Sequence, residues 1–281
     1  MKKAKSKRKN LWVYLFLSLP LFALTGCSGE HVKTDLSEFD KCKIGTLNPT
    51  YKNLVNSSEK IKEINWVDFS NYDALHQAIV NKEIDAYVGE FPTLQYEVNN
   101  YQKLYTVPKN ILENDFEYSF IFKNNTETKS FQNEFNEFLL EQKNTGNLSE
   151  LIDKWTAYQN FNNPIEIEGD DSQTEVTFYY YESEHPFSFH HNSSDGEEKL
   201  WGLDFELVVN FCKEKEYYLN LQKVQNLDEV IKELDKNYPS TPQATLYRID
   251  NNGNESVALT GEVKTWGNYF KYNYVKFDFS S

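Results

Sequence analysis

Two different hydrophobic periods alternate along this chain. Short apolar stretches of the strand type recur at residues 43–47, 63–70, 84–90 and 116–122. Between them, apolar residues repeat at helical spacing, as on the predicted face formed by Tyr72, Leu75, Ile79 and Val80. Strands that alternate with helices are typical of a parallel or mixed sheet covered on both faces. The pattern therefore predicts an α/β fold.

The second half of the chain repeats this alternation after a polar interval. A long amphipathic helix is predicted first, with an apolar face made by Phe131, Phe135, Phe138 and Leu139. Gly146 ends it, and a second helix follows with Leu148, Leu151, Ile152 and Trp155. Residues 158–174 are polar and acidic, which is typical of a linker. Beyond the linker we expect strands at 175–181, 217–224 and 243–249, and helix faces made by Leu203, Leu207, Val208 and Phe211 and by Leu227, Val230, Ile231 and Leu234.

The N-terminal segment predicts export. Its basic start, the apolar run from Leu11 to Leu24 and the ending Leu-Thr-Gly-Cys are typical of a secretory signal, too short for a membrane-spanning helix. The ending also resembles the lipobox of bacterial lipoproteins, which implies a signal peptide at 1–26, a diacylated Cys27 and a tether at 27–41. Acyl chains hold a protein at a bilayer through about 0.8 kcal/mol per buried methylene. We expect an extracytoplasmic protein anchored to the bacterial membrane.

The net charge and the cysteine content restrict the classes of partner and the covalent links that we expect. Without residues 1–26 the chain has 23 basic and 43 acidic residues, a net charge of −20. Nucleic acids and anionic lipid surfaces attract basic footprints, so no nucleic-acid partner is expected. Cys42 and Cys212 are the remaining thiols; nothing in their spacing requires a disulfide, and none is expected.

Three stretches resemble the polar amino acid family of bacterial solute-binding proteins, which deliver ligands to ABC importers. The stretch "YYYESEHPFSF…GLDFELV…NLDEVIKEL" resembles the start of the first lobe of that family. The stretch "KIGTLNPTYKNLV…NYDALHQAIVNKEIDAYVGE" is similar to its second lobe, and "FEYSFIFKNN…FNEFLLEQKNTGNLSELIDKW" to the segment that returns to the first lobe. The resemblance implies a periplasmic-binding-protein-like type II fold with two α/β lobes, mixed sheets and a hinge.

The order of these segments departs from the family. Here a second-lobe segment (42–115) precedes the return segment (116–157), and the first-lobe segment (175–281) follows the linker. Either the chain is circularly permuted, with residues 158–174 joining the old termini, or it is a truncated tandem of incomplete domains. We favour permutation, because the termini of a domain often lie close together at the surface. It implies a single covalent connection between the lobes, near residues 112–117.

The resemblance implies a ligand site carried over residue by residue. The ligand-binding candidates are Thr50, Tyr51, Glu90, Tyr181, Glu184, Leu227 and Arg248. Thr50 follows Pro49 at a predicted helix start, which favours an anion but equally suits a simple capping residue. Glu90 stands where the family usually has an Asp that pairs with the ammonium group of the ligand; the alternative is a solvated surface acid.

Arg248 departs from the family pattern. It is the only arginine after residue 26, and a guanidinium is the side chain that offers a fork to a carboxylate. The family usually places its carboxylate-binding Arg later, where this chain has "NYFKYNYVKFDFSS" and Lys271. Recognition of an amino acid carboxylate is therefore in doubt even if a solute is bound.

No enzyme is predicted, because phosphate-binding Gly loops, "GxSxG" and "HExxH" are all missing from the sequence. His185, His190 and His191 suit a solvated hairpin better than a metal site, since no carboxylate or thiolate at ligand spacing accompanies them. We expect neither cofactor nor metal. The leading hypothesis is a monomeric, lipid-anchored protein that binds a small polar solute, possibly an amino acid, for an ABC importer permease. The alternative is a surface interaction or sensory lipoprotein whose solute-binding fold no longer binds a ligand; a related dehydratase comes third.

Overall fold

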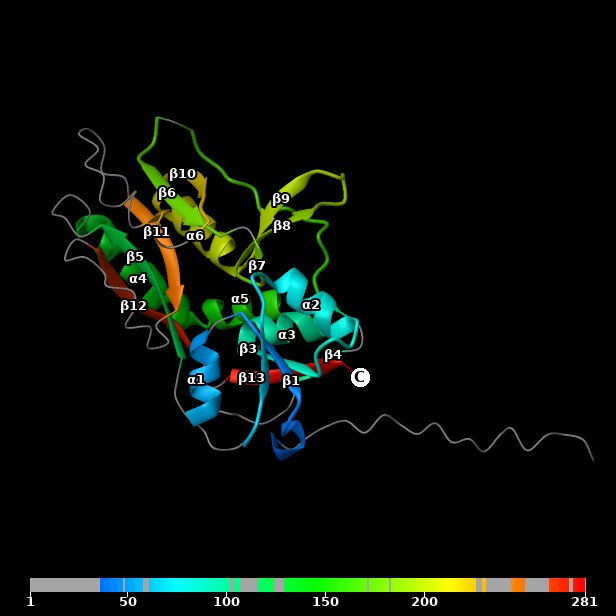
Figure 1. Cartoon of the computed structure of the whole chain (residues 1–281). Coiled ribbons are helices and arrows are strands. Elements are labelled where there is room, and N and C mark those ends of the chain that lie inside the picture. Colours follow the sequence, from blue (N-terminus) through cyan, green and yellow to red (C-terminus); the bar gives the residue numbers. More distant parts are fainter. Residues whose placement is uncertain are drawn as a thin grey trace, which may run out of the picture. The chain divides into compact units, whose positions relative to one another are not determined.

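The computed structural model describes residues 36–47, 49–57, 61–101, 104–106, 116–123, 129–170, 172–181, 183–225, 229–230, 244–250, 263–272 and 275–280. These residues form two five-stranded sheets and a small three-stranded sheet (Figure 1). Cys27 and Leu227 lie outside the described residues. No helix in the described part has the length and apolar character needed to cross a membrane.

The first sheet has the strand order β2-β1-β3-β13-β4. Its strands are β1 (Lys43–Thr46), β2 (Asn65–Asp68), β3 (Ala86–Glu90), β4 (Leu104–Thr106) and β13 (Val275–Ser280). β1 pairs in parallel with β2 and β3, whereas β13 runs antiparallel to β3 and β4. The helical elements of this part are a 3-10 turn (Leu36–Phe39), α1 (Pro49–Ser57), α2 (Tyr72–Val80) and α3 (Phe91–Asn100).

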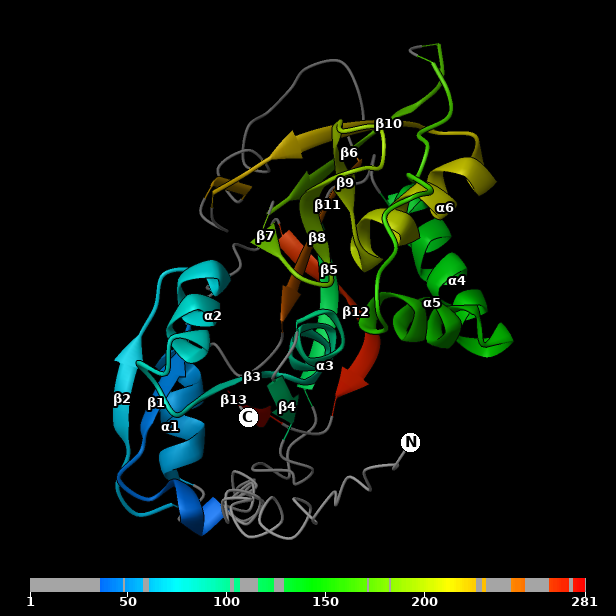
Figure 2. The same ribbon diagram turned by 90° about the vertical axis from the view of Figure 1, so that its right-hand side faces the viewer.

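The second sheet has the strand order β10-β6-β11-β5-β12. Its strands are β5 (Phe116–Lys123), β6 (Glu175–Tyr180), β10 (Tyr218–Lys223), β11 (Ala244–Asp250) and β12 (Val263–Tyr272). β6 is parallel to β10 and β11, and β5 is antiparallel to β11 and β12 (Figure 2). The helices are α4 (Lys129–Thr145), α5 (Asn147–Thr156) and α6 (Leu203–Lys215), and the small sheet contains β7 (Ser183–Glu184), β8 (Ser188–Asn192) and β9 (Glu198–Trp201).

Both large sheets follow one rule. Numbered in chain order within each sheet, and leaving out one inserted strand, the first three strands are parallel and lie side by side in the order second, first, third. The inserted strand, which comes from the other part of the chain, then follows, antiparallel to the third strand, and the fourth strand lies beyond it. In the first sheet the inserted strand is β13, and in the second it is β5. This is a type II periplasmic-binding-protein-like α/β fold, so the predicted fold class is confirmed.

Two expectations about the connections between the sheets are wrong. β13 belongs to the first sheet, although residues 175–281 were all expected in the lobe of the second. The chain therefore passes between the sheets twice, between Thr106 and Phe116 and between Tyr272 and Val275, rather than once. The reason is long-range pairing: β13 finds unpaired edges on β3 and β4, which no local pattern shows.

Each large sheet has its own hydrophobic core. The core of the first contains Ile44, Ile79 and Leu94, all fully buried. The core of the second is aromatic, and Phe120, Phe135 and Phe211 meet there edge to face. The predicted apolar face of α4 is confirmed, since its buried residues are Phe131, Phe135, Phe138 and Leu139.

The predicted face of α2 is partly wrong. Leu75 and Ile79 are buried, but Val80 is 48% exposed and Ala78 is buried in its place. At about 100° per residue, Ala78 lies beside Leu75 on the helix surface whereas Val80 lies far round from it.

The two thiols lie in different cores. Cys42 is half-buried and packs against the first core, and Cys212 is buried in the second. Burial raises the pKa of the Cys212 thiol to about 12, so the thiol stays protonated and unreactive at neutral pH.

Candidate functional site

The candidate site is built around the carboxylate of Glu90, the last residue of β3. Tyr51, in the first turns of α1, donates a hydrogen bond from its hydroxyl to Oε1 of Glu90. Tyr51 is buried and Glu90 is half-buried. The structure thus brings together two of the predicted ligand-binding residues, which are 39 positions apart in the sequence.

Glu90 also stands at the N-terminus of α3 as its N-cap residue. Its side chain makes no capping hydrogen bond to the backbone of α3, although Pro follows in the first turn. The positive end of the helix dipole nevertheless favours a negative charge at this position. The Glu90 carboxylate therefore lies at the positive end of α3 and accepts the hydrogen bond of the Tyr51 hydroxyl there.

Tyr72, the first residue of α2, shares this environment. Burial of its hydroxyl raises the pKa of Tyr72 well above its usual value, and the charges of Glu90, Glu184 and Glu97 raise it further. A side-chain hydrogen bond with Thr93 of α3 acts in the opposite direction. Tyr72 therefore stays a neutral hydrogen-bonding group at all ordinary pH values.

Glu184 brings a second carboxylate from another part of the chain. It belongs to β7 in the small sheet, is half-buried, and lies close enough to Tyr72 for its charge to act on the Tyr72 hydroxyl. Carboxylates and aromatic rings in one place favour a cation such as an ammonium group. The chemistry of this cluster is therefore suited to binding a positively charged group.

A hydrogen bond fastens the cluster to the turn after Glu184. Thr93, which is 2% exposed, donates from Oγ1 to the backbone carbonyl of His185 over 2.9 Å. Because Thr93 also bonds Tyr72, the connection runs from α2 through α3 to the segment that carries Glu184.

The other predicted site residues are placed as follows. Thr50 lies in the first turn of α1, as predicted, and the structure describes only its backbone. Tyr181 follows β6, and its carbonyl accepts a hydrogen bond from Ser188 Oγ over 2.8 Å. Arg248 lies in β11, in register with Phe120 of β5. The structure describes only the backbone of Arg248, and among the described residues it shows no link from Tyr181 to the Glu90 cluster.

The sequence does not mark Tyr72 and Thr93 as members of the site. Tyr72 occupies an apolar helix face, which is typical of a core residue, and Thr93 lies three residues beyond Glu90 with no motif around it. The one usable signal was the proximity of Thr93 to the strand end at Glu90, because the residues that begin a helix after a strand gather at the same edge of the sheet.

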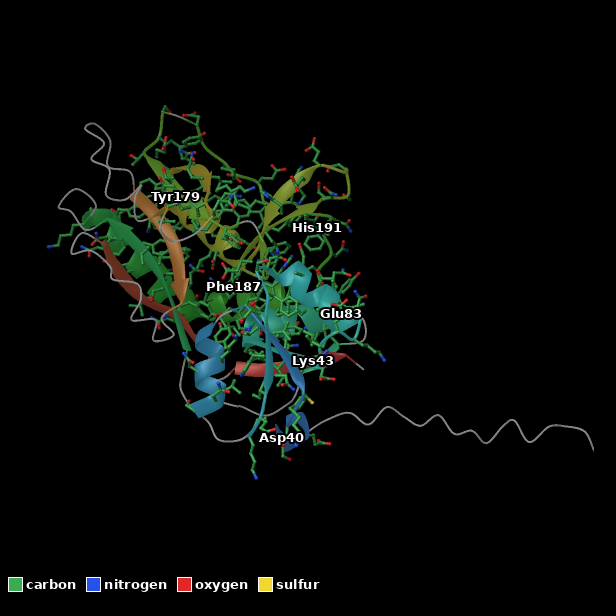
Figure 3. All side chains as sticks on the ribbon, in the orientation of Figure 1. Asp40, Lys43, Glu83, Tyr179, Phe187 and His191 are labelled. Carbon is green, nitrogen blue, oxygen red and sulfur yellow. The ribbon has the colours of Figure 1, made fainter. Side chains whose placement is uncertain are left out.

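The three histidines pack against aromatic rings. His185 stacks on Tyr96, His190 lies edge to face with Tyr180, and His191, labelled in Figure 3, lies 3.8 Å from the ring of Phe161 between centroids. Within the described residues, no three His, Cys, Asp or Glu side chains gather in a way that could hold a metal ion.

Comparison with known proteins finds similarity in structure only. No family model matches the chain, and no curated protein matches it. The GluR0 ligand-binding core in complex with L-glutamate is 11% identical, with a TM-score of 0.41 over 86% of this chain and 85% of that one. The effector-binding domain of QuiR in complex with shikimate is 10% identical, with a TM-score of 0.41 over 86% and 87%.

A third solved structure is the periplasmic VFT2 domain of BvgS from Bordetella pertussis. It is 6% identical, with a TM-score of 0.39 over 87% of this chain and 83% of that one. The fold assignment rests on the strand order within the chain itself.

Proposed function

We propose that this protein binds a small polar solute through a positively charged group. The observations that carry the proposal are the hydrogen bond from Tyr51 to Glu90 of the first sheet and the charges of Glu90 and of Glu184 from the small sheet, which both act on the buried hydroxyl of Tyr72. Tyr51 and Thr93 supply further hydroxyls at the same place. An ammonium-bearing solute such as an amino acid fits this combination of acids and tyrosines.

The cellular role extends this proposal. A lipid anchor at Cys27 would hold the protein at the outer face of the membrane, and an ABC importer permease would receive the solute. The support is the signal-like N-terminus with its Leu-Thr-Gly-Cys ending and the family resemblance. Replacing Cys27 by Ser is expected to move the protein from the membrane fraction to the medium or periplasm of an expressing bacterium; unchanged membrane retention would exclude this anchor.

Isothermal titration calorimetry tests the binding proposal. A panel of amino acids, simple amines and small carboxylates is titrated into the protein, and amine-bearing compounds are expected to bind while carboxylates without an amine are not. Glu90→Gln and Glu184→Gln keep size and remove charge. Each should weaken binding about 10- to 100-fold, because a hydrogen bond to a charged group contributes roughly 1.5–3 kcal/mol.

Glu137→Gln is the matched control. Glu137 is exposed on α4, so this substitution makes the same chemical change away from the site. Equal binding by all three variants would exclude the Glu90 cluster as the site.

A second candidate function is that of a protein with the same fold that binds no solute. It is favoured by one observation: the polar groups of the cluster already bond one another, Tyr51 to Glu90 and Tyr72 through Thr93 to His185. Such a protein would act as a surface interaction or sensory lipoprotein. No heat of binding across the whole panel would favour this function over solute transport.

A further inference from the structure

Helix α3 packs into two cores at once. Leu94 is fully buried in the core of the first sheet, and Tyr96 is 3% exposed in the core of the second. Residues two positions apart point to opposite sides of a helix. Because α3 continues directly from β3, the first sheet carries an element that is embedded in the second core.

The C-terminal end of α3 is tied to the end of α5. Asn99 Nδ2 donates to the carbonyl of Thr156 over 2.6 Å, and Asn100 Nδ2 donates to the carbonyl of Ala157 over 3.1 Å. The backbone N–H of Gln159 returns a hydrogen bond to Asn100 Oδ1 over 2.8 Å. None of these groups changes charge with pH.

The N-terminal half of α3 is held at His185. Besides the hydrogen bond from Thr93 to the His185 carbonyl, the His185 ring stacks on Tyr96 with centroids 4.9 Å apart and planes at 16°. The ring also lies against Phe189 of β8, with centroids 4.3 Å apart, and Phe189 and Tyr96 are themselves neighbours with centroids 5.6 Å apart. Nδ1 of His185 is buried and has no hydrogen-bond partner among the described residues.

The electrostatic surroundings disfavour a proton on this ring. Burial, followed by the charges of His191 and His76, lowers the pKa of His185 to about 4. The neighbouring elements carry these titratable groups: His76 on α2, Tyr96, Glu97 and Tyr101 on or beside α3, Glu184 on β7, and His190 and His191 on β8.

Glu97 of α3 lies against His76 of α2: Oε2 of Glu97 is 3.2 Å from Nδ1 of His76. Burial raises the pKa of Glu97 and His76 lowers it.

We propose that His185 and α3 form an acid-released latch: the neutral ring holds α3 against the β7–β8 segment, and protonation of the ring detaches this contact while the sheets stay folded. The latch needs no bound solute, so it stands independently of the proposed function.

The direction of the pH effect follows from linkage. An exposed histidine has a pKa of about 6.5. Between about pH 6.5 and pH 4 the His185 ring is therefore protonated in the released state and neutral in the latched state. The contribution of the neutral ring to latching is therefore fully present above about pH 6.5 and is lost as the pH falls towards 4. Over these 2.5 units the latch equilibrium shifts by up to about 300-fold. Glu97 opposes this effect. Burial raises its pKa in the latched state, so protonation of the Glu97 carboxylate in acid favours latching.

Hydrogen exchange measured by mass spectrometry tests the latch on the full chain. Between about pH 7 and pH 4, after correction for intrinsic exchange rates, peptides covering 91–100 and 183–192 should lose protection on the order of 100-fold relative to peptides of α4. His185→Phe keeps the ring stacking and removes the titration, so this loss should vanish. His190→Phe makes the same change on β8 and should preserve the loss.

Three results would overturn the proposal. One is an equal pH-dependent loss in His185→Phe and the wild type, and another is a parallel loss in α4, which would mean global acid unfolding. Should His185→Phe fail to fold, an NMR titration of the wild-type His185 ring decides: a midpoint below 6.5 that coincides with the loss of protection supports the latch, and a midpoint at about 6.5, or one that does not coincide with that loss, overturns it.

Discussion

Leu139 and Leu140 follow each other in α4 and have the same side chain, yet their surroundings differ completely. Leu139 is 4% exposed in the aromatic core of the second sheet, whereas Leu140 is 58% exposed. One step along a helix rotates a side chain by about 100°, so position on the helix surface decides what each leucine contributes.

The two leucines give a matched prediction. Leu139→Ala should lower the free energy of unfolding by about 2–5 kcal/mol, because it loses burial and leaves a cavity. Leu140→Ala should change it by less than about 0.5 kcal/mol. Urea denaturation followed by circular dichroism measures both, and equal effects would contradict the packing of α4.

Single residues of the candidate site also differ in how far the sequence predicts their role. Tyr51 and Glu90 could be proposed from the sequence because a family pattern marks both positions. Tyr72 and Thr93 could not, since a tyrosine on an apolar helix face and a threonine in a first helical turn have ordinary structural explanations. Only the folded chain shows which side chains share one environment, through the hydrogen bond from Tyr51 to Glu90 and the effects of Glu90, Glu184 and Thr93 on Tyr72.

At the scale of elements, the start of α6 depends on the turn before β8. The first N–H groups of α6 donate to the carbonyls of that turn, from Leu203 to Pro186 over 2.8 Å and from Asp204 to Phe187 over 2.9 Å. Gly202 precedes the helix with φ +126°, and a Cβ there would lie 2.2 Å from the Phe187 carbonyl oxygen. The close approach of two backbones therefore requires glycine.

Two glycines test this contact. Gly202→Ala should destabilise the protein by more than about 3 kcal/mol, because it adds a backbone clash to an unfavourable φ. Gly196→Ala, in the β8–β9 turn with φ +85° and open space around its Cα, should cost only about 1–2 kcal/mol. Thermal unfolding compares the two variants; similar costs would show that α6 does not depend on the Phe187 carbonyl.

At the scale of the whole chain, each large sheet is completed by a strand from the other side of the linker. β5 precedes the linker and lies between β11 and β12, and β13 follows the linker and lies between β3 and β4. This exchange is what a circularly permuted two-lobe fold requires, so we retain permutation as our proposal for the order of segments. A tandem of incomplete domains has no need for such an exchange.

Cutting the linker tests the exchange. A specific protease site placed at Ile167, which is 41% exposed, would separate β1–β5 from β6–β13 covalently. The fragments should still co-elute in size-exclusion chromatography and part only in denaturant, because both sheets and the second core contain residues of each fragment. An uncut sample of the same variant is the control, and separate elution under native conditions would contradict the shared sheets.

The sequence by itself determined much of the local structure, namely the strands β1, β2, β3, β5, β6, β10 and β11, the apolar face of α4 and the α/β class, because periodicity depends on neighbours a few residues apart. It marked neither α3 nor the strands β4, β12 and β13. Tertiary structure alone decided that β13 joins the first sheet, that the chain crosses between the sheets twice, and that the charge of Glu184 acts on Tyr72. Those outcomes depend on pairing between residues distant in sequence, and hydrophobic periodicity carries no information about which distant edge a strand or a carboxylate will meet.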